Sequence, residues 1–311
     1  MKKVLIVLIS IVFAVSCTVS FSACKKKTGF EPRVAIIAGT EEEYGFAVRR
    51  AFLPSTLSKI TGSEYTTADV IVKVNEVIEE LEDDMEALRD YYMNIYEKNP
   101  PGVCPIDIPD VNAKEGTAGT LIVGTEADFG IFEFAVESVG DIKGIVMTSS
   151  IPNKYLTGLD IAIMILTADK LNMKIQVREI FFDDLPDALL NGTIHVIAAA
   201  FSITEGRSLT MTFSDSYYSA TQTILSNKSA KLTTLKSLRG KVVAVQAGST
   251  SEELIINAIN DGTLLKGSKE KSLARVKSYG RIANAYGDLK RGNIHAIVVD
   301  CTIAMLLATQ W

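Results

Sequence analysis

The stretch that most constrains this chain covers residues 194–218, where an apolar segment changes abruptly into a polar one. Residues 194–200 are nearly all aliphatic or alanine and are too few for a globular helix, so they predict a short strand that is covered on both faces. Hydroxyl groups and an arginine follow at once, among them Ser202 and Arg207. Open α/β sheets bind ligands at the carboxyl ends of their strands, and a guanidinium group matches a carboxylate. This stretch therefore predicts a site for a small anionic group.

A second segment repeats this construction one hundred residues later. Leu189, Gly192, Ile194, His195 and Ile197 recur as Leu289, Gly292, Ile294, His295 and Ile297. Each segment has the pattern of a helix that ends at glycine and a strand that begins immediately. Strands and helices alternate from residue 121 onward, which indicates an α/β fold. We expect two lobes of similar construction that are joined by a connector at 221–226 and close on a ligand.

The front of the chain has a different pattern. Residues 34–38 and 44–48 are strand candidates, and apolar residues at helical spacing predict one amphipathic helix over 69–96. Its acidic run, residues 79–84, is expected to be a solvated face and not a metal site. Residues 99–119 are rich in proline and glycine and are expected to be a linker.

The first residues have the pattern of an export signal. Two lysines precede an apolar core at 4–15, which is too short to span a bilayer but suits a secretory signal. Cys24 follows small residues and resembles the lipidated cysteine of a lipoprotein, with Cys17 as the alternative and a plain cleaved signal as a third reading. We expect an exported protein that is lipid-anchored at the cell membrane, periplasmic or cell-surface. The formal net charge of −5 argues against a nucleic-acid partner.

Two more polar positions follow strands in the second half of the chain. Ser249 with Glu252, and Thr250 with Glu253, are each spaced as a capping box, so a helix is predicted to start there and to offer free amides to an anion. Asp300 follows the apolar strand predicted at 294–299, and a carboxylate at that edge suits an ammonium group.

The string from Ala200 to Arg207, with Phe213-Ser214-Asp215 and Tyr217-Tyr218, resembles the signature of the bacterial extracellular solute-binding proteins of family 3. The resemblance implies a type II periplasmic binding protein-like fold, with two α/β lobes and a two-segment hinge. It also implies a monomer without cofactor or metal, which binds a free amino acid and delivers it to the permease of an ABC importer.

The resemblance further implies roles for individual residues. Arg207 and Thr250 would hold the α-carboxylate of the ligand, and Asp300 its ammonium group. The remaining positions expected to contact the ligand are Phe129 and Phe182, which would sandwich the side chain, Glu126 and Gln246, which would face it, Ala200 through its backbone, and Ser202 through its hydroxyl group.

The sequence departs from the family in several places. His195 and His295 replace aspartates that are structural in the family, Ala162 stands where an acid is common, and Gly130-Ile131 replaces the usual proline before Phe132. Residues 135–156 match nothing in the family and are expected to reshape the mouth of the cleft.

The order of the segments implies a circular permutation. The family places a crossing segment Y-G-I-A-V-R-K and a helix after the strand that Asp300 ends, whereas here Tyr44-Gly45-Phe46-Ala47-Val48-Arg49-Arg50 stands near the front. The alternative is a separate N-terminal helical domain. Permutation predicts that Trp311 lies near Phe30, and it predicts these parts: signal 1–24, tether 25–33, second lobe 34–43 with 224–311, first lobe 44–98 with 120–223, and linker 99–119.

Two other functions remain open. The same fold also resembles that of an enzyme class, the periplasmic cyclohexadienyl dehydratases. If this chain were such an enzyme, its Glu126 or Glu205 could serve as the proton donor. The chain could instead be an adhesin or partner-binding lipoprotein. Turnover of prephenate or arogenate would identify the enzyme, and failure to bind any amino acid would favour the adhesin.

Overall fold

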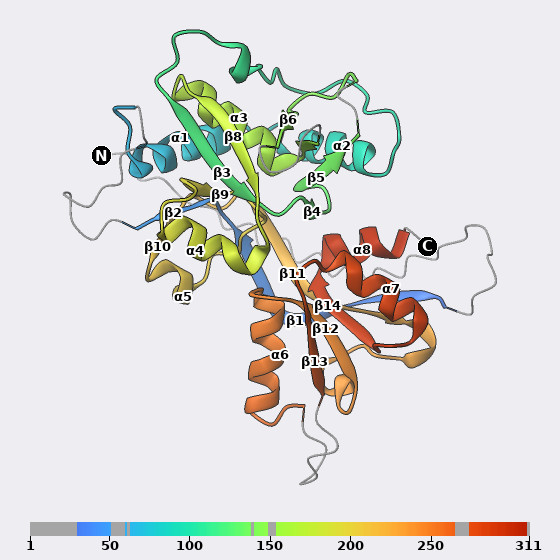
Figure 1. Cartoon of the computed structure of the whole chain (residues 1–311). Coiled ribbons are helices and arrows are strands. Elements are labelled where there is room, and N and C mark those ends of the chain that lie inside the picture. The colour runs from blue at the N-terminus through green and yellow to red at the C-terminus, as the bar shows by residue number, and fades with distance from the viewer. Residues whose placement is uncertain are drawn as a thin grey trace, which may run out of the picture. The chain divides into compact units, whose positions relative to one another are not determined.

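A computed structural model describes residues 30–50, 60, 63–137, 140–148, 154–264 and 274–309. The chain divides into two units, residues 1–30 and residues 31–311, and the helices and strands named below lie in the second unit. Cys24, Cys17 and Trp311 fall outside the described residues. The second unit contains two central five-stranded sheets, each the core of one lobe (Figure 1). The expected α/β class is confirmed.

The sheet of the first lobe has the order β10-β2-β9-β3-β8. Its strands are β2 (Ala47–Arg49), β3 (Thr120–Thr125), β8 (Lys174–Glu179), β9 (Val196–Ile197) and β10 (Met211–Phe213). β3 pairs in parallel with both β8 and β9, whereas β2 is antiparallel to β9 and β10. The apolar run at 194–200 thus contains a fully buried strand, as expected. The carboxyl ends of β3, β8 and β9 share one edge, and the polar residues after β9 emerge there.

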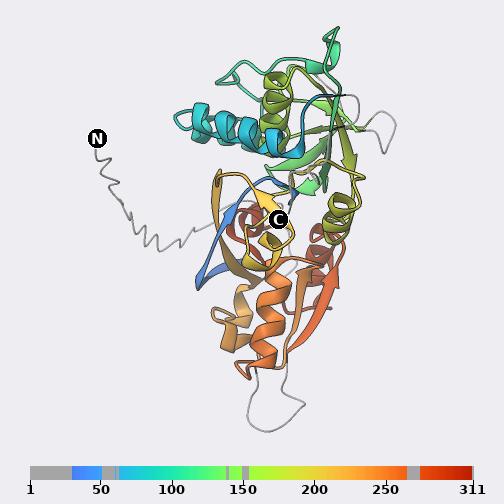
Figure 2. The ribbon, with the colours of Figure 1, turned by 90° about the vertical axis from the view of Figure 1, so that its left-hand side faces the viewer.

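The helices of the first lobe are α1 (Thr67–Glu80), α2 (Met85–Tyr96), α3 (Leu159–Lys170), α4 (Leu185–Leu190) and α5 (Glu205–Ser208). α1 packs against α3 (Figure 2). The single helix expected over 69–96 is wrong, because α1 is capped at Leu81 and α2 begins at Met85. The acidic run at 79–84 explains the break, since carboxylates are unfavourable at the negative end of a helix and repel one another a turn apart.

The segment without a family counterpart has structure of its own. A four-stranded antiparallel sheet of order β4-β5-β7-β6 consists of β4 (Asp128–Phe129), β5 (Glu133–Val136), β6 (Val146–Met147) and β7 (Tyr155–Thr157). An isolated bridge between Thr148 and Val177 joins it to β8. The segment 135–156 therefore extends the first lobe beside the edge strand of its main sheet.

The sheet of the second lobe has the order β1-β11-β14-β12-β13. Its strands are β1 (Pro32–Tyr44), β11 (Tyr218–Asn227), β12 (Val242–Gln246), β13 (Arg275–Tyr279) and β14 (Ala296–Asp300), and its helices are α6 (Thr250–Asn260), α7 (Ala283–Arg291) and α8 (Cys301–Thr309). β12 is parallel to β13 and β14, whereas β11 is antiparallel to β1 and β14. Short 3₁₀ turns lie at Val111–Ala113, Phe182–Asp184, Lys228–Ala230 and Leu235–Leu238.

Two neighbouring segments carry the chain between the lobes. One runs from β1 to β2 and the other from β10 to β11, and they are joined by bonds from Tyr217 N to Tyr44 O (3.1 Å) and from Ser214 N to Phe46 O (2.9 Å). The single strand expected at 44–48 is wrong, because Tyr44 ends β1 in one sheet and Ala47 begins β2 in the other. The connector expected at 221–226 lies within β11 of the second-lobe sheet, so the chain crosses earlier, at residues 214–217, and β11 spans the expected lobe boundary between residues 223 and 224.

The front of the chain is distributed over both lobes. The strand expected at 34–38 lies within β1 in the second-lobe sheet, residues 44–48 lie in the crossing, and α1 and α2 contact α3 of the first lobe. Among the described residues, 34–97 therefore do not pack as a unit of their own.

The repeat found in the sequence is a repeat of structure. α4 ends before Gly192 and α7 before Gly292, and both glycines have left-handed φ, 80° and 76°. The two histidines have matching roles: His195 Nδ1 accepts from Ile122 N (3.1 Å) and His295 Nδ1 accepts from Val242 N (3.0 Å). Burial lowers the pKa of both imidazoles. Both histidines are thus hydrogen-bonded residues at strand starts.

Among the described residues, no helix is long and apolar enough to cross a membrane.

Candidate functional site

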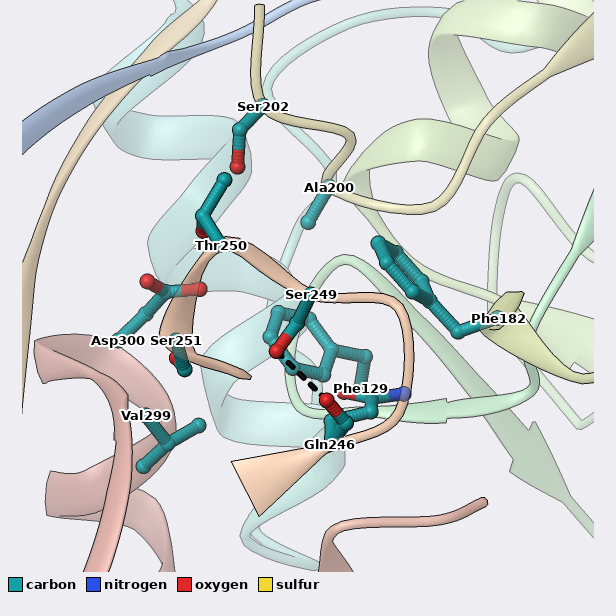
Figure 3. Close-up of a pocket in the computed structure, with 10 residues that line it drawn as sticks. All are labelled: Phe129, Phe182, Ala200, Ser202, Gln246, Ser249, Thr250, Ser251, Val299 and Asp300. Atoms are coloured by element: carbon teal, nitrogen blue, oxygen red, sulfur yellow. Dashed lines mark hydrogen bonds between the residues drawn. The ribbon is translucent and has the colours of Figure 1, made fainter. Parts of the chain in front are cut away.

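A small cavity lies where the two lobes meet, and its lining comes from both. The first lobe contributes Phe129, Phe182, Ala200 and Ser202, and the second contributes Gln246, Ser249, Thr250, Ser251, Val299 and Asp300. Figure 3 shows Phe182 on one side and Ser202, Thr250 and Asp300 on the other. The cavity measures about 20 Å³, which is close to what a single water molecule needs. Any larger guest therefore requires the lobes to move apart.

Asp300 forms the anionic part of the polar end. Asp300 is 7% exposed, and its carboxylate oxygen atoms accept hydrogen bonds from the Tyr44 hydroxyl and from Gln222 Nε2. Burial, and to a smaller extent the negative Glu42, raise the pKa of the Asp300 carboxyl to about 7, although the two hydrogen bonds and Arg207 oppose the rise. No cation within the described chain forms an ion pair with Asp300. A buried carboxylate of this kind is suited to an ammonium group.

Arg207 lies beside the cavity and joins the two lobes. Its guanidinium donates to Ser202 O (2.8 Å) in the first lobe and to Gly248 O (3.1 Å) in the second. The group lies 3.8 Å from the centre of the Phe201 ring, and burial lowers its pKa to about 10. The resemblance implies that Arg207 holds the ligand carboxylate; in this closed cavity Arg207 is not among the lining residues, and its guanidinium donates to the backbone of both lobes.

The aromatic end has a second buried acid behind it. Phe129 and Phe182 are each 7% exposed and line the cavity, in the first-lobe positions expected for them. Gln246 lines the same end and donates a hydrogen bond to Glu126 Oε2 across the lobes, while Glu126 Oε1 has no hydrogen-bond partner among the described residues. Burial raises the pKa of the Glu126 carboxyl to about 8. Glu126 thus reaches the site through Gln246 and is not itself a lining residue.

Ala200 turns the chain into the cavity with a left-handed φ of 45°. Its N–H donates to Asp160 Oδ2 (2.9 Å), and the Tyr217 hydroxyl donates to the other oxygen of Asp160 (2.7 Å). The Ala200 N–H is thus taken up by this buried carboxyl, which leaves the carbonyl oxygen as the backbone group that Ala200 could offer to a ligand. Asp160 therefore fixes the turn that presents Ser202.

The start of α6 forms the second-lobe wall. Ser249 is the N-cap and accepts from Glu252 N (3.2 Å), as the spacing predicted. The reciprocal bond differs, because Glu252 Oε2 accepts from Gly248 N (2.8 Å) one residue earlier. Gly248 has a φ of 71°, and a Cβ there would lie 3.0 Å from Asp183 Cα of the first lobe. Glycine is therefore required for this close approach.

A further ion pair also joins the lobes. Glu179 at the end of β8 pairs with Arg281 of the second lobe and with Lys154 of the first (2.8 Å). The Glu179 side chain is 5% exposed and the Arg281 side chain 27%. Together with the contacts of Arg207 and Gln246, this pair holds the cavity closed.

Several residues around the site were missed from the sequence. Ser249, Ser251 and Val299 line the cavity next to predicted residues, so a wider window around each motif would have found them. Tyr44, Glu42 and Gln222 belong to β1 and β11, where the sequence shows no ligand motif. Among the described residues, no group of three or more histidine, cysteine, aspartate and glutamate side chains is placed to hold a metal ion.

The family comparison covers more than half of the chain. The model of the family described as bacterial extracellular solute-binding proteins, family 3, matches residues 121–293. The match therefore spans the first-lobe sheet from β3 onward, the crossing to β11, and the second lobe as far as the residues before β14.

Individual relatives match shorter parts. The arginine-binding extracellular protein ArtP of Bacillus subtilis (strain 168) is 32% identical over 133 residues, 43% of this chain and 46% of that protein. The glutamine-binding protein of Geobacillus stearothermophilus is 28% identical over 195 residues, 62% of this chain and 65% of that protein. The chain thus spans 46% and 65% of the length of these two curated relatives. Among solved structures, an ancestral arginine-binding protein bound to arginine matches with a TM-score of 0.51 and 33% identity, covering 61% of this chain and 74% of that one.

Proposed function

Because this chain belongs to the bacterial extracellular solute-binding proteins of family 3, we propose that it binds one free α-amino acid in the cavity between its lobes. The ligand's ammonium group pairs with Asp300. Its carboxylate accepts hydrogen bonds from the hydroxyl groups of Ser202 and Thr250 and is stabilised by the nearby positive charge of Arg207. Its side chain extends between Phe129 and Phe182.

The polarity of the cavity carries this proposal. One end offers Asp300, a buried carboxylate that forms no ion pair with any described residue, next to the hydroxyl groups of Ser202 and Thr250, and the other end is aromatic. A free amino acid has the same order of groups along its length. The small volume implies that the ligand enters when the lobes open and that they then close around it less tightly than in this structure.

A thermal-shift screen of the twenty amino acids plus ornithine tests this function. We expect at least one to raise the melting temperature, because a ligand that binds only the folded state stabilises it by mass action. Calorimetry then gives the affinity of the best ligand. A screen in which none of the compounds shifts the melting temperature would contradict the proposal and favour a role as adhesin or partner-binding protein.

The route of the ligand is part of the same proposal. The protein is exported, held at the membrane by a lipid on Cys24, and hands its amino acid to the permease of an ABC importer. The relatives named for arginine and glutamine binding support the ligand class. Radiolabelled palmitate incorporated into the wild type but not into Cys24→Ala would support the anchor, and labelling that survives in Cys24→Ala and is lost in Cys17→Ala would move it to Cys17.

A second candidate function rests on Glu126. Its pKa of about 8 means that the carboxyl group is mostly protonated at neutral pH, which is the state a general acid requires. In that case the protein would act as a dehydratase on prephenate or arogenate. Incubation of the purified protein with each compound, with Glu126→Gln as control, decides between the two functions.

We also propose that the chain is circularly permuted relative to its family. β1 supplies the edge strand of the second-lobe sheet, residues 44–50 cross to the first lobe, and α1 packs on α3, so segments at the front of the chain complete both lobes. Superposition of residues 121–309 on a solved family member should place residues 32–96 on that protein's C-terminal segment. Their superposition on any other segment would refute permutation.

A further inference from the structure

Glu42 of β1 presents its carboxylate to the polar end of the cavity. Its Oε2 atom accepts hydrogen bonds from the Ser202 hydroxyl (2.8 Å) and from the Thr250 hydroxyl (2.8 Å). Its Oε1 atom accepts from Gln222 Nε2 (3.1 Å). Ser202 belongs to the first lobe and Thr250 to the second, so one oxygen atom of Glu42 joins both walls of the cavity.

A bulge in β1 turns Glu42 toward the site. Ile36 pairs with Thr223 and Glu41 with Thr221, so residues 37–40 stand opposite Gln222 alone. The shift adds three residues to β1, and an odd number reverses which side chains face each side of the sheet. Glu42 then pairs with Ala220 and shares the face of Gln222, which itself pairs with Asp300. The exposed neighbours Glu41 and Glu43 point to the other face.

The charges around Glu42 match those that a ligand carboxylate requires. Although burial lowers the pKa of the Arg207 guanidinium overall to about 10, the negative charge of the nearby Glu42 acts to raise it. Glu42 therefore has two hydroxyl donors that line the cavity and a nearby guanidinium group. These are the groups to which the proposed function assigns the α-carboxylate of the amino acid.

We propose that Glu42 competes with the α-carboxylate of the ligand for the hydroxyl groups of Ser202 and Thr250, an inference that rests on the proposed function. It occupies the hydroxyl groups of Ser202 and Thr250 in the unliganded protein and turns away when the amino acid enters. Each hydroxyl group has a single proton to donate, and two carboxylates that share the same pair of donors repel each other. The Glu42 carboxylate and the ligand carboxylate therefore cannot be bound there together. Glu42 is only half-buried, which leaves its side chain a way out to solvent.

Competition at this position has a chemical signature. Removal of Glu42 should tighten the binding of compounds that carry an α-carboxylate and should leave their decarboxylated amines nearly unaffected. If Glu42 were instead a strut that only holds the lobes closed, its removal would weaken both kinds of compound. The two roles therefore predict changes of opposite sign for the amino acid.

The test repeats the screen of twenty amino acids plus ornithine on the wild type, Glu42→Ala and Glu42→Gln. Glu42→Gln keeps the shape of the side chain and removes its charge, and it serves if Glu42→Ala melts early. Glu43→Ala is the matched control, because it removes the same charge from the opposite face of the same strand. The best amino acid and its decarboxylated amine, for example arginine and agmatine, are then measured by calorimetry on all four proteins.

We expect both Glu42 variants to bind the amino acid at least about fivefold more tightly than the wild type, which corresponds to about 1 kcal/mol. The amine should change by less than about twofold, and Glu43→Ala should resemble the wild type. Amino-acid binding that is unchanged or weaker in both Glu42 variants, or an equal gain for the amine, would overturn the competitor role alone. Failure of the wild type and of both variants to bind any amino acid would refute the proposed function and this inference with it.

Discussion

Amino-acid binding should strengthen about tenfold when the pH rises from 6 to 8, because Asp300 must be ionised to pair with the ligand's ammonium group. Burial, and to a smaller extent the negative Glu42, raise the pKa of this carboxyl to about 7. The hydrogen bonds from Tyr44 and Gln222 and the charge of Arg207 act in the opposite direction but do not restore an ordinary pKa.

The magnitude follows from the ionised fraction. With a pKa of about 7, roughly one tenth of the Asp300 carboxyl groups are charged at pH 6 and roughly nine tenths at pH 8. A free amino acid remains a zwitterion over this range, so the ligand contributes little to the change. Since only the charged form of Asp300 pairs with the ammonium group, binding at pH 6 must release a proton.

Calorimetry at pH 6, 7 and 8, in two buffers that differ in ionisation enthalpy, measures both quantities. We expect about 0.9 protons released per ligand at pH 6 and about 0.1 at pH 8. Asp300→Asn is the control, and it should bind weakly with an affinity that does not depend on pH. An affinity of the wild type that stays constant or falls from pH 6 to pH 8 would refute the assignment of Asp300 to the ammonium group.

Three further predictions concern the closed cavity and the fold. Arg207→Ala should weaken amino-acid binding by at least about thirtyfold, because it removes the buried positive charge beside the proposed carboxylate site together with the hydrogen bonds by which Arg207 joins the lobes, and truncation of a buried, hydrogen-bonded charge costs about 2–5 kcal/mol. A change below about threefold by calorimetry, with the exposed Arg275→Ala as control, would show that Arg207 does not act on the ligand. Arg281→Ala should weaken binding by about fivefold, because it breaks the pair with Glu179 that holds the lobes closed, at a cost of about 1 kcal/mol; an unchanged affinity would exclude this contact from closure. The ligand-free protein should lose stability from pH 5 to pH 8, because burial raises the pKa of Asp160 to about 7 and the protonated form is favoured in the folded state. Urea unfolding should show that the free energy of unfolding falls less steeply with pH in Asp160→Asn than in the wild type, and an equal fall in both proteins would contradict this role.

The sequence alone determined those parts of this protein that depend on neighbouring residues. β14, the start of α6 and the ends of α4 and α7 lie within a residue or two of where the apolar run, the capping spacing and the glycines placed them. Ser249 caps α6 as its spacing to Glu252 predicted. These features follow from local patterns, because a strand or a helix start is encoded by residues only a few positions apart.

Charge repulsion along the front helix was also present in the sequence, although the periodicity concealed it. Apolar residues at helical spacing continue across residues 69–96, and they predict one helix. The turn between α1 and α2 shows that several consecutive acids outweigh that periodicity. Both the apolar periodicity and the acidic run are local features of the sequence, and the acidic run decides where the helix ends.

Only the tertiary structure decided which side chains meet at the cavity. The Tyr44 hydroxyl bonds to Asp300 across 256 positions of sequence, and Glu42 bonds to Thr250 across 208. Neither contact has a local motif, because each depends on the order β1-β11-β14 and on the register that the bulge at 37–40 imposes. The closed state of the cavity likewise depends on bonds between the lobes, such as the one from Arg207 to Gly248. Sequence patterns fix a residue's place along its own strand, whereas its partners across a sheet or between lobes are set by pairing and register over the whole chain.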